Sequence, residues 1–152
     1  MNLQALLKLQ QYCVYQDRNH QEVRSKLLKM KIYGDGLEEI MASLIEDDFL
    51  NEERFAKAYA SGKFRINYWG KNKIKMQLKS KRISEYCIKV ALDQIEQEEY
   101  RASLQKILEK KSRELKGKSL NSYQLKSKLY QFAHGRGFES FMISAALESI
   151  LD

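Results

Sequence analysis

The sequence predicts an all-α protein made of three tandem three-helix repeats. Its 152 residues include no proline and only 7 glycines, so few positions carry a built-in backbone stop. Apolar residues make up 43% of the chain, which is enough to bury a core, and the strong helix formers Leu, Lys, Glu, Gln and Ala are frequent. A pattern of aliphatic pairs also recurs three times along the chain. These observations favour helix nearly everywhere and indicate internal repetition.

Two sets of aliphatic pairs define the repeat. In each pair the second residue follows the first by four positions, so both side chains lie on one face of a helix. The first set consists of VRSKL (23–27), IKMQL (74–78) and LKSKL (125–129), whose first residues are 51 positions apart both times. The second set consists of IMASL (40–44), IKVAL (88–92) and ISAAL (143–147). Each repeat therefore contains a helix–turn–helix.

Short breaks separate the paired helices, and a longer helix precedes each pair. The breaks are YGDG (33–36), KRIS (81–84) and HGRG (134–137), where glycine or a serine cap ends one helix and begins the next. The longer amphipathic segments are residues 3–16, 51–67 and 97–116. Asn51 is the expected N-cap of the second segment, because Glu52 and Glu53 follow it at the positive end of the helix dipole.

The predicted repeats span residues 1–50, 51–96 and 97–152. No proline-rich or glycine-rich linker separates them. We therefore expect neighbouring repeats to pack directly and to form an elongated, curved array.

Positive charge is concentrated in the last two thirds of the chain. The net charge is +7 overall, with −2 in residues 1–50, +5 in residues 51–101 and +4 in residues 102–152. Residues 63–82 hold eight basic side chains and no acidic one. Such asymmetry points to an anionic partner, with nucleic acid as the first candidate.

The basic segment is predicted to form the second helix of the middle repeat. Helical rotation places Ile74 and Leu78 in an apolar stripe, and an adjoining stripe holds Lys71, Lys75, Lys79 and Arg82. A solvated, lysine-rich helix is the alternative interpretation. The third repeat carries the same bias in KKSRELKGK (110–118) and KSK (126–128), which favours an anion-binding surface.

The candidate residues for contact with nucleic acid are the basic and aromatic side chains of these segments: Lys63, Arg65, Tyr68, Trp69, Lys71, Lys73, Lys75, Lys79, Lys81, Arg82, Lys110, Lys111, Lys118, Lys126 and Lys128. Cations of this kind neutralise phosphates without reading sequence. Base-specific reading is disfavoured, because the helix presents mainly lysines at its amino end. Tyr68 or Trp69 either stacks on exposed bases or packs against the protein.

Catalysis, cofactor binding and metal binding are not indicated. The chain has no phosphate-binding loop, nucleophile elbow or zinc-protease motif. Cys13 and Cys87 are expected as core thiols without a disulfide, and the only histidines are His20 and His134, so no zinc site is predicted. The acidic run EDD (46–48) is interpreted as a solvated helix end and not as a cation site. No apolar run reaches the ~18 residues of a membrane span, so a cytoplasmic protein without a membrane partner is expected.

With these features in view, the chain resembles the RecX family, bacterial regulators of the RecA recombinase. The most specific segments are DDFLNEERFAKAY (47–59) and YWGKNKIKMQLKSKRIS (68–84). The family pattern is matched at Leu50, Phe55, Ala56, Gly70, Lys73, Ile74, Leu78, Lys81 and Ile83. Asp48 and Arg82 stand where the family has glycine, and Glu52 replaces an aspartate. Because glycine tolerates left-handed backbone and Arg82 resists it, we expect a change in turn geometry there.

The resemblance implies a three-repeat helical protein that lies in the groove of the RecA filament on DNA. It implies contacts with RecA protomers and with single- or double-stranded DNA, and restraint of strand exchange and the coupled ATP hydrolysis. We expect a monomer that acts by binding. Two alternatives stay open: a nonspecific DNA-binding protein without a recombinase partner, and a TPR-type scaffold, whose 34-residue period the chain lacks.

Overall fold

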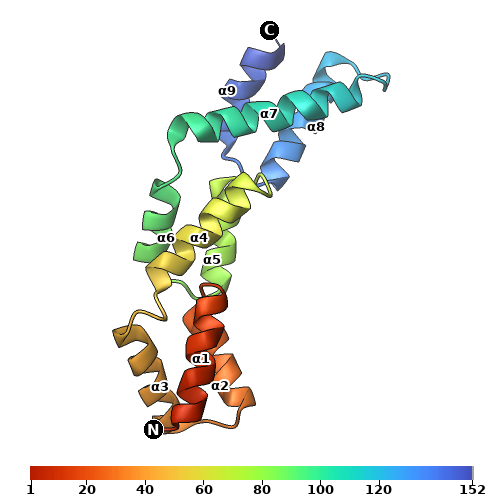
Figure 1. The fold of residues 1–152 in the computed structure, drawn as a ribbon. Coiled ribbons are helices and arrows are strands. Elements are labelled where there is room, and N and C mark those ends of the chain that lie inside the picture. Colours follow the sequence, from red (N-terminus) through yellow and green to blue (C-terminus); the bar gives the residue numbers. More distant parts are fainter. Residues whose placement is uncertain (152) are drawn as a thin grey trace. The chain divides into compact units, whose positions relative to one another are not determined.

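The computed structural model describes residues 1–151, which form nine α-helices and no strand (Figure 1). The helices are α1 (Leu3–Tyr15), α2 (His20–Lys29), α3 (Gly34–Glu46), α4 (Glu52–Arg65), α5 (Lys71–Ser80), α6 (Glu85–Asp93), α7 (Gln97–Leu115), α8 (Ser122–Gly135) and α9 (Ser140–Leu151). The middle helices α2, α5 and α8 begin at His20, Lys71 and Ser122, which reproduces the 51-residue period of the sequence. The all-α class and the tandem three-helix organisation are confirmed.

Local side-chain hydrogen bonds fix where the helices begin. The Asn51 side chain accepts a hydrogen bond from the Arg54 backbone N–H at 2.9 Å, so the predicted cap of α4 is confirmed. The Ser84 hydroxyl accepts from the Cys87 N–H at 3.2 Å and caps α6. The expected break at 33–36 is placed differently: α3 already begins at Gly34, whose φ of 56° lets the chain turn directly into the helix.

The middle helix of every repeat ends in the same backbone motif. Lys31, Arg82 and Gly137 follow α2, α5 and α8 in the left-handed region, with φ values of 64°, 61° and 96°. The next residue then donates its N–H to a carbonyl five positions earlier, as Ile83 does to Leu78 at 3.1 Å. This is the Schellman ending of a helix.

The two positions where the sequence analysis noted a departure from glycine both have left-handed backbone. Arg82 has φ 61° and Asp48 has φ 61°. The expectation that Arg82 resists left-handed backbone is therefore wrong: it adopts this conformation, at a strain of about 1–2 kcal/mol.

The chain folds into two compact units. Unit 1 consists of residues 1–59 and 78–91, and unit 2 consists of residues 60–77 and the chain from Leu92 onward. The division passes through α4, α5 and α6, so it does not follow the predicted repeats. The repeat boundaries at 50 and 96, and the elongated arrangement of the repeats, stay predictions.

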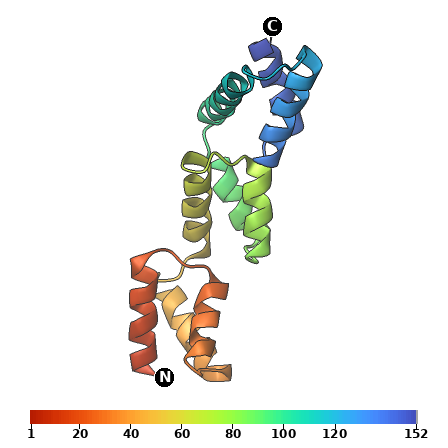
Figure 2. The ribbon, with the colours of Figure 1, turned by 90° about the vertical axis from the view of Figure 1, so that its right-hand side faces the viewer.

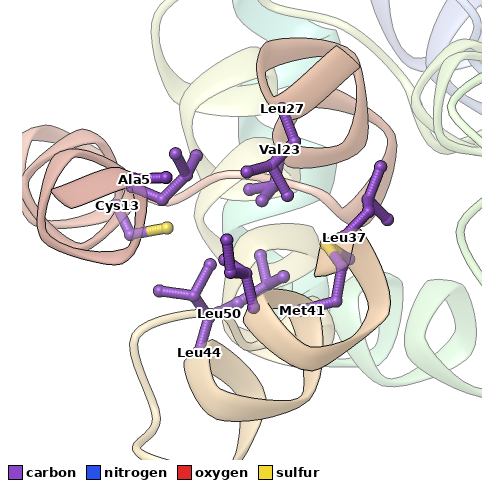
Figure 3. Close-up of a cluster of buried hydrophobic side chains, with 10 residues drawn as sticks. Ala5, Cys13, Val23, Leu27, Leu37, Met41, Leu44 and Leu50 are labelled. Atoms are coloured by element: carbon purple, nitrogen blue, oxygen red, sulfur yellow. The ribbon is translucent and has the colours of Figure 1, made fainter. Parts of the chain in front are cut away.

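The amino-terminal helices of unit 1 share one apolar cluster. In Figure 1 and Figure 2, α1, α2 and α3 lie side by side, and Figure 3 shows their side chains converging. The cluster contains Ala5, Leu9, Cys13, Val23, Leu27, Leu37, Ile40, Met41, Leu44 and Leu50. It includes both aliphatic pairs that the sequence predicts for this region. Each large aliphatic side chain buried in this way contributes about 1.5–3 kcal/mol of transfer free energy.

Both cysteines are buried free thiols, as predicted. Burial raises the pKa of the Cys13 thiol, and the positive charge of Arg18 only partly opposes this effect. The neutral thiol therefore behaves as a small apolar side chain of the core.

Unit 2 has its own core, made mainly by α7, α8 and α9, which contact one another pairwise. An aromatic row crosses this core: the ring centroids of Phe64 and Tyr100 are 5.7 Å apart, and those of Tyr100 and Phe138 are 5.1 Å apart. Leucines of α7 and α8 and aliphatics of α9 complete it, namely Leu104, Leu108, Leu129, Ile143 and Leu147. The row joins the end of α4 to the loop that follows α8.

Candidate nucleic-acid interface

A close backbone contact fixes the start of the basic helix α5 within unit 2. The N–H of Gly70 donates to the Arg136 carbonyl at 2.7 Å, and the N–H of Asn72 donates to the Gly137 carbonyl at 2.9 Å. A Cβ atom on Gly70 would lie 2.4 Å from the carbonyl carbon of Gly137. Glycine is therefore required at position 70, where two backbones meet.

The phenol of Tyr100 holds the same junction from the inside. Its oxygen accepts a hydrogen bond from the backbone N–H of Lys71 at 2.9 Å, and its O–H donates to the carboxylate of Glu139. Burial raises the pKa of Tyr100 above its usual range, and the hydrogen bond to Glu139 raises it further. The phenol therefore stays protonated and keeps its role as donor.

The loop between α4 and α5 presents two aromatic side chains that differ in their surroundings. Trp69 lies between two lysines, with the Lys63 and Lys73 ammonium groups 4.9 and 4.6 Å from its ring. Both distances fall within the cation–π range. The three side chains form one basic, aromatic cluster at the amino end of α5, and a stacking role for Trp69 stays a prediction.

Tyr68 faces a cavity of about 310 Å³ within unit 2, here named the α7/α8 cavity. The cavity is lined by Tyr68, Lys106, Ile107, Lys110, Lys111, Glu114, Phe132 and Arg136. The Lys106 ammonium donates to the Tyr68 hydroxyl at 3.3 Å. The Lys111 ammonium and the Arg136 guanidinium lie 5.2 and 5.0 Å from the centre of the Phe132 ring. Cations and aromatic faces thus line the same space.

The sequence identifies only part of this cavity. Its predicted members are Tyr68, Lys110 and Lys111. Lys106, Phe132 and Arg136 were missed. Lys106 lies one helical turn before Lys110, and this four-residue spacing was the available signal. Arg136 belongs to a segment that looks only like a turn.

Lys81 and Arg82 line a second cavity, of about 510 Å³, within unit 1. Its other lining residues are His20, Gln21, Arg24, Ser25, Leu28, Glu52 and Ser84. Arg24 is neutralised by a two-point contact with Glu38, at 2.6 and 3.1 Å. The Lys81 ammonium lies 5.6 Å from the Tyr59 ring. This cavity is less basic than the α7/α8 cavity.

Most of the remaining predicted residues point to solvent. Lys75, Lys79, Lys118, Lys126 and Lys128 are exposed, while Ile74 and Leu78 are fully buried, as the predicted stripes require. Arg65 differs, because its Nε donates to the Glu99 carboxylate at 3.0 Å. One carboxylate therefore offsets part of the expected positive charge. The binding roles of all fifteen residues stay predictions.

Within residues 1–151, no three His, Cys, Asp or Glu side chains cluster closely enough to hold a metal ion. Glu46, Asp47 and Asp48 are exposed, in agreement with the solvated helix end that the sequence predicts. Over the same residues, no helix has the length and apolarity needed to cross a bilayer.

The fold and the charge first define a class, the all-helical proteins of tandem three-helix repeats that carry clustered surface cations. Sequence models then place the chain within that class: the one described as RecX, second three-helix domain, matches residues 51–92, and the one described as RecX, third three-helix domain, matches residues 98–147. The chain belongs to the RecX family.

Named relatives agree with this placement, and a solved structure has the same fold. The chain is 32% identical over 122 residues to the regulatory protein RecX of Clostridium perfringens (strain 13 / Type A), covering 80% of this chain and 57% of the relative. It is 31% identical over 140 residues to the regulatory protein RecX of Lactococcus lactis subsp. cremoris (strain SK11), covering 91% and 52%. The chain thus spans about half the length of the curated relatives it matches. The crystal structure of RecX from Lactobacillus salivarius has the same fold, with a TM-score of 0.87 at 23% identity over 96% of this chain and 94% of that one.

Proposed function

We propose that this protein regulates the RecA recombinase by binding the RecA–DNA filament and restraining strand exchange and the coupled ATP hydrolysis. It acts by occupancy, without catalysing a reaction, as a monomer in the cytoplasm. Family membership supports a regulatory role, since the relatives are named regulatory proteins. The observation that carries the contact with DNA is the group of cations on α5 and around the α7/α8 cavity.

Phosphate neutralisation supplies the affinity in this proposal. Lys75 and Lys79 are exposed on α5, where each is able to approach a phosphate and release condensed counterions. Contacts of this type are independent of base sequence, which suits a protein that must act anywhere along a filament. When several weak contacts lie on one chain, binding through one of them raises the effective concentration of the others near the DNA.

The first repeat supplies the contact with protein in this proposal. Residues 1–50 carry a net charge of −2, in contrast to the rest of the chain. Glu39, Glu46 and Asp47 are exposed in or directly after α3. Carboxylates at these positions repel DNA and complement basic side chains of a recombinase protomer.

The rate of ATP hydrolysis by RecA on single-stranded DNA tests the proposal. We expect the rate to fall as this protein is added, and to fall less when Lys75 and Lys79 are both changed to Glu. An unchanged rate at saturating protein would refute a role as a RecA regulator.

A DNA-binding protein without a recombinase partner is the second candidate function. The α7/α8 cavity favours it, because its cations and rings need no protein partner to hold an anion. A salt titration with DNA alone separates the two functions. Tight, steeply salt-dependent binding that RecA filaments do not strengthen would favour this second candidate.

A further inference from the structure

We infer that the α7/α8 cavity binds one unpaired nucleotide, with the base stacked on its aromatic rings and the phosphate held by its cations. The inference deepens the proposed function, on which it rests for the choice of nucleic acid as the polyanion. It also predicts a preference for single-stranded over duplex nucleic acid.

The charge around the cavity is largely uncompensated. Among residues 1–151, the only carboxylate that lines it is that of Glu114, which lies 3.7 Å from the Lys111 ammonium. Within residues 1–151, no carboxylate forms an ion pair with Lys106, Lys110 or Arg136. Three cations around one small space attract an anion with more than one oxygen, such as a phosphate diester or monoester.

Arg136 is held in position before any ligand arrives. One of its terminal nitrogens donates to the backbone carbonyl of Asn67 at 3.0 Å. This bond orients the guanidinium without cancelling its charge, since a carbonyl is neutral. The remaining N–H groups stay available for a phosphate, and little side-chain entropy is lost when it binds.

The aromatic side chains that line the cavity offer a surface on which a base can stack, and a site for phosphate alone would not need such a surface. Phe132 and Tyr68 are both half-buried, so one part of each side chain is packed while another part borders the cavity. The hydrogen bond from Lys106 holds the Tyr68 ring in place. Base–aromatic stacking tolerates any base, because every base has a π-face.

The size of the cavity selects a single nucleotide. A volume of about 310 Å³ lies at the lower end of the range for small-molecule sites. A base within a duplex is paired and stacked on both sides, and its π-face is not available without unpairing. A single strand offers that face directly, which is why strand preference is the expected consequence.

The experiment uses a 15-nucleotide oligo(dT) with one central 2-aminopurine, whose fluorescence is quenched when the base stacks. We expect quenching when the 152-residue chain is added, and no further quenching with the same oligonucleotide annealed to its complement. An oligonucleotide of abasic residues should bind about tenfold more weakly, from the loss of base stacking. Equal affinity for the abasic strand and the oligo(dT) would overturn the inference.

Two competitors identify the source of the nucleotide. If adenosine 5′-monophosphate relieves the quenching, the cavity accepts a free nucleotide. If only unlabelled oligo(dT) relieves it, the cavity needs a nucleotide within a strand. Both results support the inference. Inorganic phosphate that relieves the quenching at the same concentration as adenosine 5′-monophosphate would overturn it.

Variants link the signal to the cavity. Phe132→Leu keeps the apolar volume and removes the π-face, so we expect the quenching to disappear while salt-dependent binding persists. Lys110→Glu should weaken binding of the single strand about tenfold. The matched control is Lys116→Glu, which makes the same charge change at the exposed C-cap residue directly after α7. Lys116 does not line the cavity, so we expect binding to change by about twofold at most.

Far-ultraviolet circular dichroism checks that each variant stays folded. If Phe132→Leu unfolds, Lys110→Glu still decides the question, because its side chain is exposed. Wild-type quenching by folded Phe132→Leu, or equal losses in Lys110→Glu and Lys116→Glu, would refute the inference. Failure of the proposed function looks different: RecA hydrolyses ATP at an unchanged rate, while the cavity variants still alter strand preference.

Discussion

Replacing Gly70 by alanine should destabilise unit 2, because position 70 lies against the backbone that follows α8. The new Cβ would lie 2.4 Å from both the Gly137 carbonyl carbon and the Phe138 nitrogen. Ordinary contact begins near 3.4 Å, so the two backbones must separate by about 1 Å. No flexible side-chain end is able to absorb this shift, since the nearest atoms are backbone.

The separation breaks the hydrogen bonds that join the two segments. The Gly70–Arg136 and Asn72–Gly137 bonds, now 2.7 and 2.9 Å, would lengthen beyond hydrogen-bonding distance. Each net bond is worth about 0.5–1.5 kcal/mol, and a buried group left unpaired costs about 1–3 kcal/mol. We therefore expect Gly70→Ala to lower the free energy of unfolding by about 2–4 kcal/mol.

Urea unfolding followed by circular dichroism measures this loss. With a denaturant dependence of about 2 kcal/mol per molar urea, the midpoint should fall by about 1–2 M. Gly62→Ala is the control, because Gly62 lies within α4 and an added Cβ meets nothing within 4 Å. That variant should be more stable by about 0.5–1 kcal/mol. Equal midpoints for Gly70→Ala and wild type would refute the close contact.

Three further predictions follow from other parts of the structure. Arg82→Gly should raise the free energy of unfolding by about 1 kcal/mol in urea titrations, because glycine removes the strain of φ 61°; a loss of stability would contradict this. Changing Lys75 and Lys79 together to Glu should weaken DNA binding and leave the helical content unchanged. The slope of the logarithm of the binding constant against the logarithm of the salt concentration should become shallower by about 2. An unaltered affinity would mean that these lysines are only solvated surface. Tyr100→Phe should cost about 1–3 kcal/mol at neutral pH, because the Lys71 N–H loses its acceptor. The pKa of Tyr100 is raised in the folded state, so the wild type loses stability as the pH rises above the usual value of about 10. The difference in the free energy of unfolding between the wild type and Tyr100→Phe should therefore become smaller at alkaline pH. A constant difference in alkaline urea titrations would contradict this.

Features that depend on neighbours along the chain were predictable from the sequence. The aliphatic pairs at Val23 and Leu27 and at Ile74 and Leu78 are fully buried, because a four-residue spacing alone decides which helical face they share. The cap at Asn51 was predictable for the same reason, since its partner lies three residues away. Periodicity and capping depend on residues a few positions apart, so they can be predicted from a single sequence.

Features that join distant segments were not predictable. Gly70 lies against Gly137 although the two glycines are far apart in the sequence, and no spacing rule links them. The α7/α8 cavity likewise combines a loop residue, Tyr68, with side chains of two other helices. The pairing of Arg65 with Glu99 was not predictable either, because the two residues are 34 positions apart and a charge count along the chain treats Arg65 as unpaired.

The helices α2, α5 and α8 share a left-handed ending, but this does not mean that one consensus residue fits all three positions in a designed repeat protein. Lys31 and Arg82 show that the backbone form alone admits a long side chain. Gly137 adopts the same form, but a Cβ there would lie 2.3 Å from that of Lys73. A consensus sequence that placed the commoner lysine or arginine at all three positions would keep each helix ending and push the third repeat away from the second. Equivalent positions in this chain are therefore alike in conformation and different in what they tolerate.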